Sequence, residues 1–169
     1  PGLDKGEEKR LLRGVEELWD AGLVVVVSAG NYGPDPGTVA VPGSSRKVIT
    51  VGAVDIAGRQ GGKSRAKWDY SGRGPTEDCI MKPDLVAPGT YITSCSVDYR
   101  HRFRKPYTVK SGTSMATPVV SGAIACLLSK YPDMTNVEVK LKLRESCVPS
   151  EHTQGWGMLH VGRLLSAGC

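Results

Sequence analysis

The segment from Ser111 to Pro118, which reads SGTSMATP, holds the residues with the clearest capacity for chemistry. Ser114 lies at the predicted start of an apolar helix, and Gly112 before it permits a sharp turn and close approach of other segments. Unpaired backbone N–H groups and the positive end of the helix dipole stabilise negative charge at such a start. An acyl-transfer nucleophile needs this geometry. The alternative is that Thr113 and Ser114 only cap the helix.

A second candidate is the stretch Ser28-Ala29-Gly30-Asn31, which follows a run of valines. Ligand sites in open α/β sheets lie at the carboxyl ends of strands, where Asn31 is expected. Its short side chain carries two amide donors that can stabilise a developing oxyanion. The alternative is an asparagine that only shapes a turn. Spacing alone leaves both alternatives open.

The elements that must position these residues follow from the hydrophobic pattern. Continuous β-branched runs over 23–27 and 48–54 predict strands buried on both faces of a parallel sheet. Shorter strands are expected at 91–95 and 107–109. The run over 113–130 is apolar over most of its surface, which predicts a helix packed on all sides. Together these elements predict a layered α/β fold whose few strands leave one sheet edge exposed.

Three further helices complete the prediction, at 5–21, within 133–146 and at 161–167. The first has an apolar stripe, with Asp4 as its cap and Gly22 as its end. Thr135 and Glu138 have the spacing of a capping box at the start of the helix within 133–146.

Composition excludes several classes of protein. The 169 residues carry a net charge of +5, and no apolar run is long enough to span a membrane. Basic residues cluster over 63–67 and 100–105 in turn-rich sequence, so we interpret them as solvated loops and expect no nucleic-acid partner. A nucleic-acid-binding domain would instead show steeply salt-dependent binding.

The five cysteines are odd in number and lack C-x-x-C spacing, which argues against a disulfide framework or a zinc site. Cys126 falls in the apolar helical run and is expected to pack as a small hydrophobe. Free cysteines weakly favour a reducing compartment.

Five stretches in order identify a family resemblance. They are 112–118 (GTSMATP), 28–31 (SAGN), 39–53 (with VAVPG and VITVGA), 82–89 (KPDLVAPG) and 155–157 (GWG). Over about residues 11–165 the sequence resembles the subtilase family of serine proteases. The resemblance implies a subtilisin-like three-layer α/β fold, with a parallel sheet flanked by helices. Residues 1–169 would be the C-terminal portion of a single subtilase catalytic domain.

The resemblance also implies roles for individual residues. Ser114 would be the nucleophile, and the Asn31 amide with the Ser114 N–H would bind the oxyanion. The pocket for the substrate side chain would be formed by Ser28, Ala29, Gly30 and Ala40. A small residue at Ala40 leaves room for a large apolar side chain, and Pro42 resembles the family's cis-proline. The chemistry needs no cofactor. Structural calcium occurs in the family, but no acidic cluster here has ligand spacing, so no metal residue is assigned.

The family's aspartate and histidine motifs are not found in this sequence. His101, His152 and His160 are expected to be surface or structural residues. Because a serine without a base is a weak nucleophile, we expect the chain alone to be inactive. Its expected partners are a polypeptide substrate and the missing N-terminal half, with a homodimer or domain swap as a further possibility. The alternative is a non-catalytic binding or assembly module on the same scaffold. The ending near Cys169 and the free cysteines resemble the intracellular branch of bacterial subtilases, so a cytoplasmic location is favoured over secretion.

Overall fold

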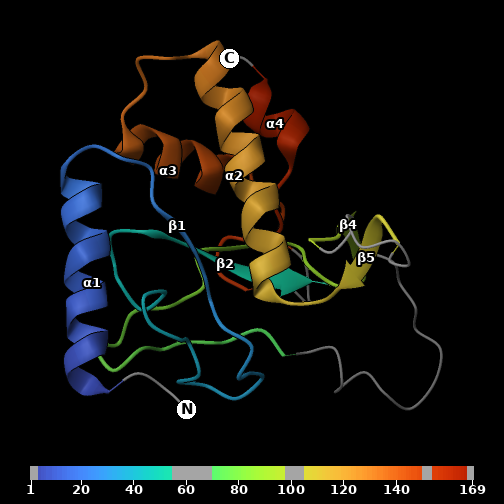
Figure 1. The fold of residues 1–169 in the computed structure, drawn as a ribbon. Coiled ribbons are helices and arrows are strands. Elements are labelled where there is room, and N and C mark those ends of the chain that lie inside the picture. Colours follow the sequence, from blue (N-terminus) through green and yellow to red (C-terminus); the bar gives the residue numbers. More distant parts are fainter. Residues whose placement is uncertain (1–3, 55–69, 98–104, 150–153, 167–169) are drawn as a thin grey trace.

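In the described residues one helix is followed along the chain by five strands and then by three helices (Figure 1). The computed structural model describes residues 4–54, 70–97, 105–149 and 154–166. Its elements are α1 (Lys5–Asp20), β1 (Val26–Ser28), β2 (Ile49–Val54), β3 (Leu85–Pro88), β4 (Ile92–Cys95), β5 (Tyr107–Lys110), α2 (Thr113–Lys130), α3 (Asn136–Ser146) and α4 (Val161–Leu165). All four predicted helices and four predicted strands are confirmed within a few residues. Strand β3 was not predicted.

The three parallel strands form one sheet in the order β1-β2-β3. Strand β2 lies at its centre and is buried, as the sequence predicts. Strand β1 is only half-buried, so the prediction of a strand buried on both faces is wrong there. The reason is its place at the edge of the sheet, where among the described residues it pairs with β2 alone.

The two edges of this sheet differ. At β3, the backbone N–H of Val86 donates to Gly157 (3.0 Å) and its carbonyl accepts from Leu159 (2.9 Å), so the outer edge of β3 is covered. At β1, no strand among the described ranges lies on the outer side. The predicted exposed edge is therefore confirmed, and any further strand has room only beside β1.

Helix α2 packs on all three strands but buries only one of its faces. Its buried side comprises Thr113, Ala116, Val120, Ala123, Ile124 and Leu127. Apart from Lys130 at its end, the exposed residues of α2 recur at helical spacing and form what we call the α2 stripe: Ser114, Pro118, Ser121, Gly122, Ala125, Cys126 and Ser129. The prediction of a helix packed on all sides is therefore wrong, because no described segment covers this face of α2. The prediction that Cys126 packs as a small hydrophobe is wrong for the same reason, since its side chain is exposed. None of the described helices is long and apolar enough to span a membrane.

The other helices are attached by buried polar and aromatic contacts. Trp19 of α1 belongs to the core, and Asn136 at the start of α3 donates from Nδ2 to its carbonyl oxygen (2.7 Å). Both predicted caps are present: Asp4 with Glu7 forms a capping box on α1, and Thr135 with Glu138 forms one on α3. The predicted Gly22 has a positive φ of 90° just after α1.

Strands β4 and β5 form an antiparallel hairpin beside the N-terminal end of α2 (Figure 1). Most of its residues are exposed, including the large apolar side chains of Tyr107 and Val109. The hairpin leads directly into the loop before Ser114.

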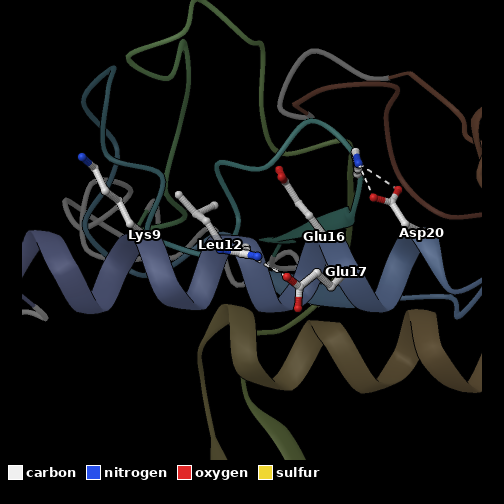
Figure 2. A pocket seen from close by; sticks show the side chains of 7 residues that line it. Lys9, Leu12, Glu16, Glu17 and Asp20 are labelled. Atoms are coloured by element: carbon white, nitrogen blue, oxygen red, sulfur yellow. Dashed lines mark hydrogen bonds and ion pairs between the residues drawn. The ribbon is translucent and has the colours of Figure 1, made fainter.

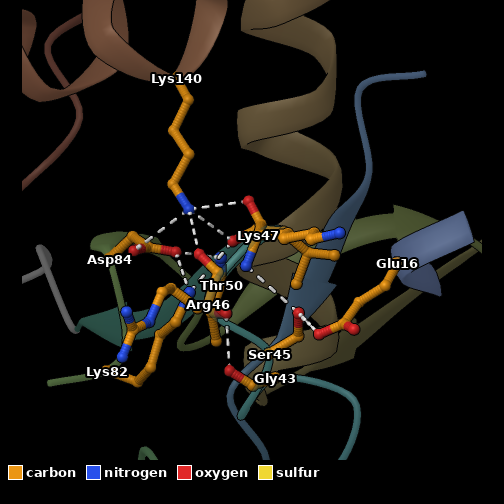
Figure 3. A network of polar contacts seen from close by, with 10 residues as sticks. Glu16, Gly43, Ser45, Arg46, Lys47, Thr50, Lys82, Asp84 and Lys140 are labelled. Carbon is orange, nitrogen blue, oxygen red and sulfur yellow. Dashed lines mark hydrogen bonds and ion pairs between the residues drawn. The ribbon is translucent and has the colours of Figure 1, made fainter. Parts of the chain in front are cut away.

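A buried ion pair joins β2 to the segment before β3 (Figure 3). The ammonium of Lys82 donates to Asp84 Oδ2 (2.6 Å) and to the carbonyl of Val48 (3.0 Å), with side chains 1% and 9% exposed. The same Oδ2 accepts from the backbone N–H of Thr50 (2.7 Å). Lys140 reaches in from α3 and lies 3.8 Å from Asp84 Oδ1.

One carboxylate therefore serves two ammonium groups. Burial lowers the pKa of Lys82 below its ordinary value, and burial lowers that of Lys140 to about 8. Asp84 opposes both shifts, because its negative charge stabilises the charged lysines. Asp84 therefore favours the charged form of both buried lysines.

Replacing Asp84 with alanine should lower the free energy of unfolding by about 3–5 kcal/mol, because it leaves buried ammonium charge without its partner. The loss should shrink above the Lys140 pKa, where that side chain gives up its proton and less buried charge remains. Urea denaturation of the two proteins at neutral and alkaline pH measures both effects. Asp133→Ala, at an exposed position, is the control. A loss no larger than that of the control would contradict the assigned role of Asp84.

Candidate active site

Asn31 and Thr113, which are 82 positions apart in the chain, meet where β1 ends and α2 begins. Asn31 Oδ1 accepts from the backbone N–H of Thr113 (2.9 Å) and from its Oγ1 (3.1 Å). Because a backbone N–H can only donate, the atom that faces it must be the amide oxygen. The amide nitrogen therefore points elsewhere, and it has no partner among the described residues. Thr113 is itself fully buried, so the residue that orients the Asn31 amide is held in place by the core.

Ser114 is the second residue of α2 and is exposed. Its hydroxyl has no hydrogen-bond partner within the described part of the chain. The preceding loop is held by the segment after β3: Gly112 donates its N–H to the Gly89 carbonyl (2.9 Å), and the Tyr91 N–H donates to Ser111 Oγ (2.9 Å). A Cβ at Gly89 would lie 2.9 Å from the Gly112 carbonyl, so only glycine allows this approach. Ser114 therefore lies at a helix start whose preceding loop is held in place by hydrogen bonds to the segment after β3.

The four predicted pocket residues lie beside this pair. Ala40 donates its N–H to the Ala29 carbonyl (2.8 Å), which joins the two segments that contain them. Gly30 has φ of 87°, and a Cβ there would lie 2.6 Å from the Ala40 Cβ. Ser28, Gly30 and Ala40 are half-buried, whereas Ala29 is fully buried and offers no accessible side chain. The Val41–Pro42 bond is cis, as predicted.

Sequence reasoning missed Thr113 and Gly89 as site residues. Thr113 was considered only as a helix cap, yet its two donors hold Asn31. Gly89 was noted only as the end of a family stretch, and the phenol of Tyr70 adds a hydrogen bond to its carbonyl (3.2 Å). Neither contact has a local signal, because both join segments far apart in the chain.

Among the described residues, the histidine is engaged at a helix start, and no hydrogen bond joins it to Ser114. His160 caps α4, where its Nδ1 accepts from the Arg163 N–H (3.1 Å), so its predicted structural role is confirmed. The predictions for His101 and His152, and for the basic clusters at 63–67 and 100–104, lie outside the described residues, whereas Lys105 at the end of the second cluster is exposed.

Metal and thiol chemistry find little support in the described residues. No group of three or more His, Cys, Asp or Glu side chains there could hold a metal ion. Cys79, Cys95 and Cys126 are free and exposed, and Cys169 lies outside the described residues. Cys147 is free and buried, and burial raises the pKa of its thiol to about 11, which disfavours the reactive thiolate.

A surface pocket lies on α1, away from this site (Figure 2). Its lining residues are Lys9, Leu12, Arg13, Glu16, Glu17, Asp20 and Lys47. The ion pairs Arg13–Glu17 and Lys47–Asp20 neutralise much of its charge, and it contains neither Ser114 nor Asn31. We therefore place the candidate site at the start of α2.

The described site thus combines a serine exposed at a helix start with an amide oriented by that helix on a parallel α/β scaffold, and serine hydrolases use a serine and an amide donor in this way. The sequence profile of the subtilase family matches residues 6–157, and the chain belongs to that family. One relative to which it is similar is a serine protease, and one solved structure to which it is similar is a protease.

Two relatives and two solved structures illustrate the similarity. Serine protease AprX of Bacillus subtilis is 44% identical over 149 residues, which cover 83% of this chain and 34% of AprX. Subtilisin DY of Bacillus licheniformis is 35% identical, over 79% of this chain and 42% of its own length. The self-cleaved protease domain of PatA superposes with a TM-score of 0.68 at 27% identity, over 92% of this chain and 53% of that one. The S41 psychrophilic protease gives 0.69 at 26% identity, over 87% and 51%.

The chain spans a third to about half of the length of these proteins. The predicted fold class, a parallel sheet flanked by helices of the subtilisin type, is confirmed by both the structure and its neighbours.

A double-mutant cycle tests the contact that orients Asn31. Asn31→Ala and Thr113→Val should show a coupling of about 0.5–1.5 kcal/mol in the free energy of unfolding, because each change removes the same Oγ1–Oδ1 hydrogen bond. Urea denaturation of the wild type, both single variants and the double variant measures it. Tyr32→Ala, at a side chain 75% exposed, replaces Asn31→Ala in the control cycle and should show no coupling. Additive effects of Asn31→Ala and Thr113→Val would show that the contact does not form.

Proposed function

We propose that Ser114 is the nucleophile of a serine endopeptidase and that Asn31 binds its oxyanion. The observation that carries the proposal is the double contact of Thr113, the residue before Ser114, with Asn31 Oδ1, which leaves the amide nitrogen without a partner among the described residues. A binding module needs neither an oriented amide nor an exposed serine at that place. Subtilase membership supports the same conclusion.

The proposed reaction proceeds through an acyl-enzyme. Ser114 Oγ attacks the peptide carbonyl and loses its proton to a base, which passes the proton to the leaving amine. The negative charge that develops on the carbonyl oxygen accepts hydrogen bonds from Asn31 Nδ2 and the Ser114 backbone N–H. Water then releases the acyl group from Ser114. In subtilisin, loss of the oxyanion-hole asparagine lowers turnover roughly 10²–10³-fold, and a similar loss is expected for Asn31. The reaction needs no cofactor.

The side chain that precedes the cleaved bond would lie along Ser28, Gly30 and Ala40. Ala40 is small and half-buried, and its backbone is bonded to Ala29. A small residue at the base of such a pocket supports a preference for large apolar side chains in a polypeptide substrate. Ala29, being buried, would contribute only its backbone.

The base must come from elsewhere. The family's aspartate and histidine motifs are not in this sequence, and His160 is engaged as a helix cap. We infer that the chain is the C-terminal portion of one catalytic domain, and that the N-terminal half of that domain supplies both residues. An isolated serine hydroxyl is not ionised near neutral pH, so the chain alone should be inactive.

Two open surfaces support this assembly. The outer edge of β1 lacks a strand partner among the described residues, and unpaired strand edges recruit further strands. The α2 stripe runs from Ser114 to Ser129 and consists of small residues, over which another helix can pack closely. Both lie next to the candidate site, where a base must arrive. A homodimer through the same surfaces is the competing arrangement, and a cytoplasmic location stays a prediction.

Labelling with a fluorophosphonate probe tests the proposed nucleophile. The isolated chain should not react, whereas a chimera in which residues 6–157 replace the matching segment of AprX should be labelled at Ser114. Intact-mass and peptide mass spectrometry locate the label, and the Ser114→Ala chimera is the control. Labelling of the isolated chain would show that a base already reaches Ser114. A folded chimera without label would favour the non-catalytic module.

A charged substitution in the α2 stripe tests the proposed assembly. Ala125→Arg should lower the labelling rate of the chimera more than tenfold, because the new charge has no room once the N-terminal half packs on α2. The unfolding midpoint of the isolated chain should stay unchanged, since Ala125 is exposed there. Glu145→Arg, at an exposed position of α3, is the control. Equal labelling of both variants would show that the stripe is not covered.

A further inference from the structure

The loop that contains Asn31 is held on both sides by one short segment, which runs from Tyr70 to Gly72 and which we call the clamp segment. The backbone N–H of Gly72 donates to the carbonyl of Gly30, the residue before Asn31 (2.9 Å). The N–H of Gly33, two residues after Asn31, donates to the Tyr70 carbonyl (2.9 Å). These two hydrogen bonds bracket Asn31 and fix its loop at both ends.

The clamp segment lies so close to this loop that side chains are excluded between them. A Cβ at Gly33 would overlap the Ser71 carbonyl, and a Cβ at Gly72 would lie 2.5 Å from the Ala29 carbonyl oxygen. The clamp segment is also tied to the central strand of the sheet, because Ser71 Oγ accepts from the Ala53 N–H of β2 (3.1 Å). The loop of Asn31 is thus held against a fixed part of the fold.

The side chain of Tyr70 reaches the other half of the candidate site. Its phenol oxygen lies 3.2 Å from the Gly89 carbonyl oxygen and 3.0 Å from Thr90 Oγ1. A carbonyl can only accept, so the single phenol proton goes to Gly89, and the Thr90 hydroxyl donates to the phenol oxygen. The Gly89 carbonyl also accepts from the N–H of Gly112, two residues before Ser114 (2.9 Å).

The contacts of the phenol are largely shielded from water. Gly89 is buried, Thr90 is 5% exposed, and Tyr70 is half-buried and packs against the core. Water therefore has little access to replace the phenol as a partner of these groups, and loss of its hydroxyl leaves them less well satisfied.

These bonds close a ring with the direct contact between Thr113 and Asn31. Each step of the ring is a hydrogen bond or a short stretch of chain, and Tyr70 supplies the step that lies opposite the direct contact. The ring runs through Asn31, Gly33, Tyr70, Gly89, Gly112 and Thr113. In a closed ring, the position of one loop restrains the position of the other.

We propose that Tyr70 is a positioning residue that sets the distance between the oxyanion donor and the nucleophile. Its backbone is bonded to the loop of Asn31 and its phenol to the segment that holds the loop of Ser114, so one residue spans both halves of the site. It acts through Gly33 on one side and through Gly89 on the other. The inference rests on the roles proposed above for Ser114 and Asn31.

Amide hydrogen exchange of the full 169-residue chain tests this role without any need for activity. Tyr70→Phe keeps the ring and the backbone and removes only the hydroxyl. The amides of Gly112 and Thr113 should then exchange roughly 3–10-fold faster, which corresponds to one lost hydrogen bond, whereas the Val139 amide inside α3 should not change. Nuclear magnetic resonance measures each amide separately. Equal acceleration of all three amides, or none at Gly112 and Thr113, would overturn the proposal.

Matched substitutions identify the phenol as the cause. Tyr107→Phe, at a tyrosine of β5 that is 62% exposed, should leave the exchange of the Gly112 and Thr113 amides unchanged. Thr90→Val removes the hydroxyl that donates to the phenol and should accelerate both amides, whereas Thr90→Ser keeps that hydroxyl and should not. An effect of Tyr107→Phe as large as that of Tyr70→Phe would contradict the role of the Tyr70 phenol.

Steady-state kinetics of the AprX chimera, with a peptide p-nitroanilide as substrate, test the consequence for catalysis. Tyr70→Phe should lower kcat about tenfold, because small displacements of reacting groups cost rate steeply, and should leave KM within about twofold. Tyr107→Phe should change neither constant.

The outcomes separate this inference from the proposed function. A folded chimera that is not labelled at Ser114 by the fluorophosphonate contradicts the proposed function, and amide exchange in the isolated chain then decides whether Tyr70 holds the two loops. A labelled chimera with the same kcat before and after Tyr70→Phe would overturn the inference and leave the proposed function standing.

Discussion

The contact of Thr113 with Asn31 is the constraint on which the candidate site depends. It joins the end of an edge strand to the start of the longest helix, 82 positions later in the chain. Its geometry holds only while α2 stays packed on the sheet through Val120 and Leu127, which are fully buried. The core and the site are therefore coupled, because any shift of α2 along the strands moves Ser114 and releases the amide of Asn31.

The same fold is closed on one side and open on the other. Residues 154–159 cover the edge of β3, and the Lys82–Asp84 pair with Lys140 fixes the strand ends beneath α3. The edge of β1 and the α2 stripe lack described partners. Polar groups and charges thus stabilise the side of the fold near β3 and α3. The surfaces next to the candidate site have no packing partner among the described residues. Membership of the subtilase family and the fraction of each relative that the chain spans agree with that division.

Local patterns predicted local structure well. The apolar spacing and caps of α1, α2 and α3 give their bounds within one or two residues. The start of β1 was misplaced because its valine run continues without a break, so no residue type marks where pairing begins. Strand β3 is four residues long and ends at Pro88, too short for a period to show. The exposed Cys126 and the role of Thr113 depend on which segments meet in space, and a single sequence carries no signal for that.

The proposed mechanism requires the Asn31 amide nitrogen to face the carbonyl that Ser114 attacks. The most direct measurement is a crystal structure of the AprX chimera with a peptide boronate, which forms a tetrahedral adduct on an active serine. The account predicts an adduct on Ser114 Oγ, with one boronate oxygen about 2.7–3.1 Å from Asn31 Nδ2 and from the Ser114 backbone N–H. An adduct on another residue, or on Ser114 with both oxygens directed away from Asn31, would contradict it.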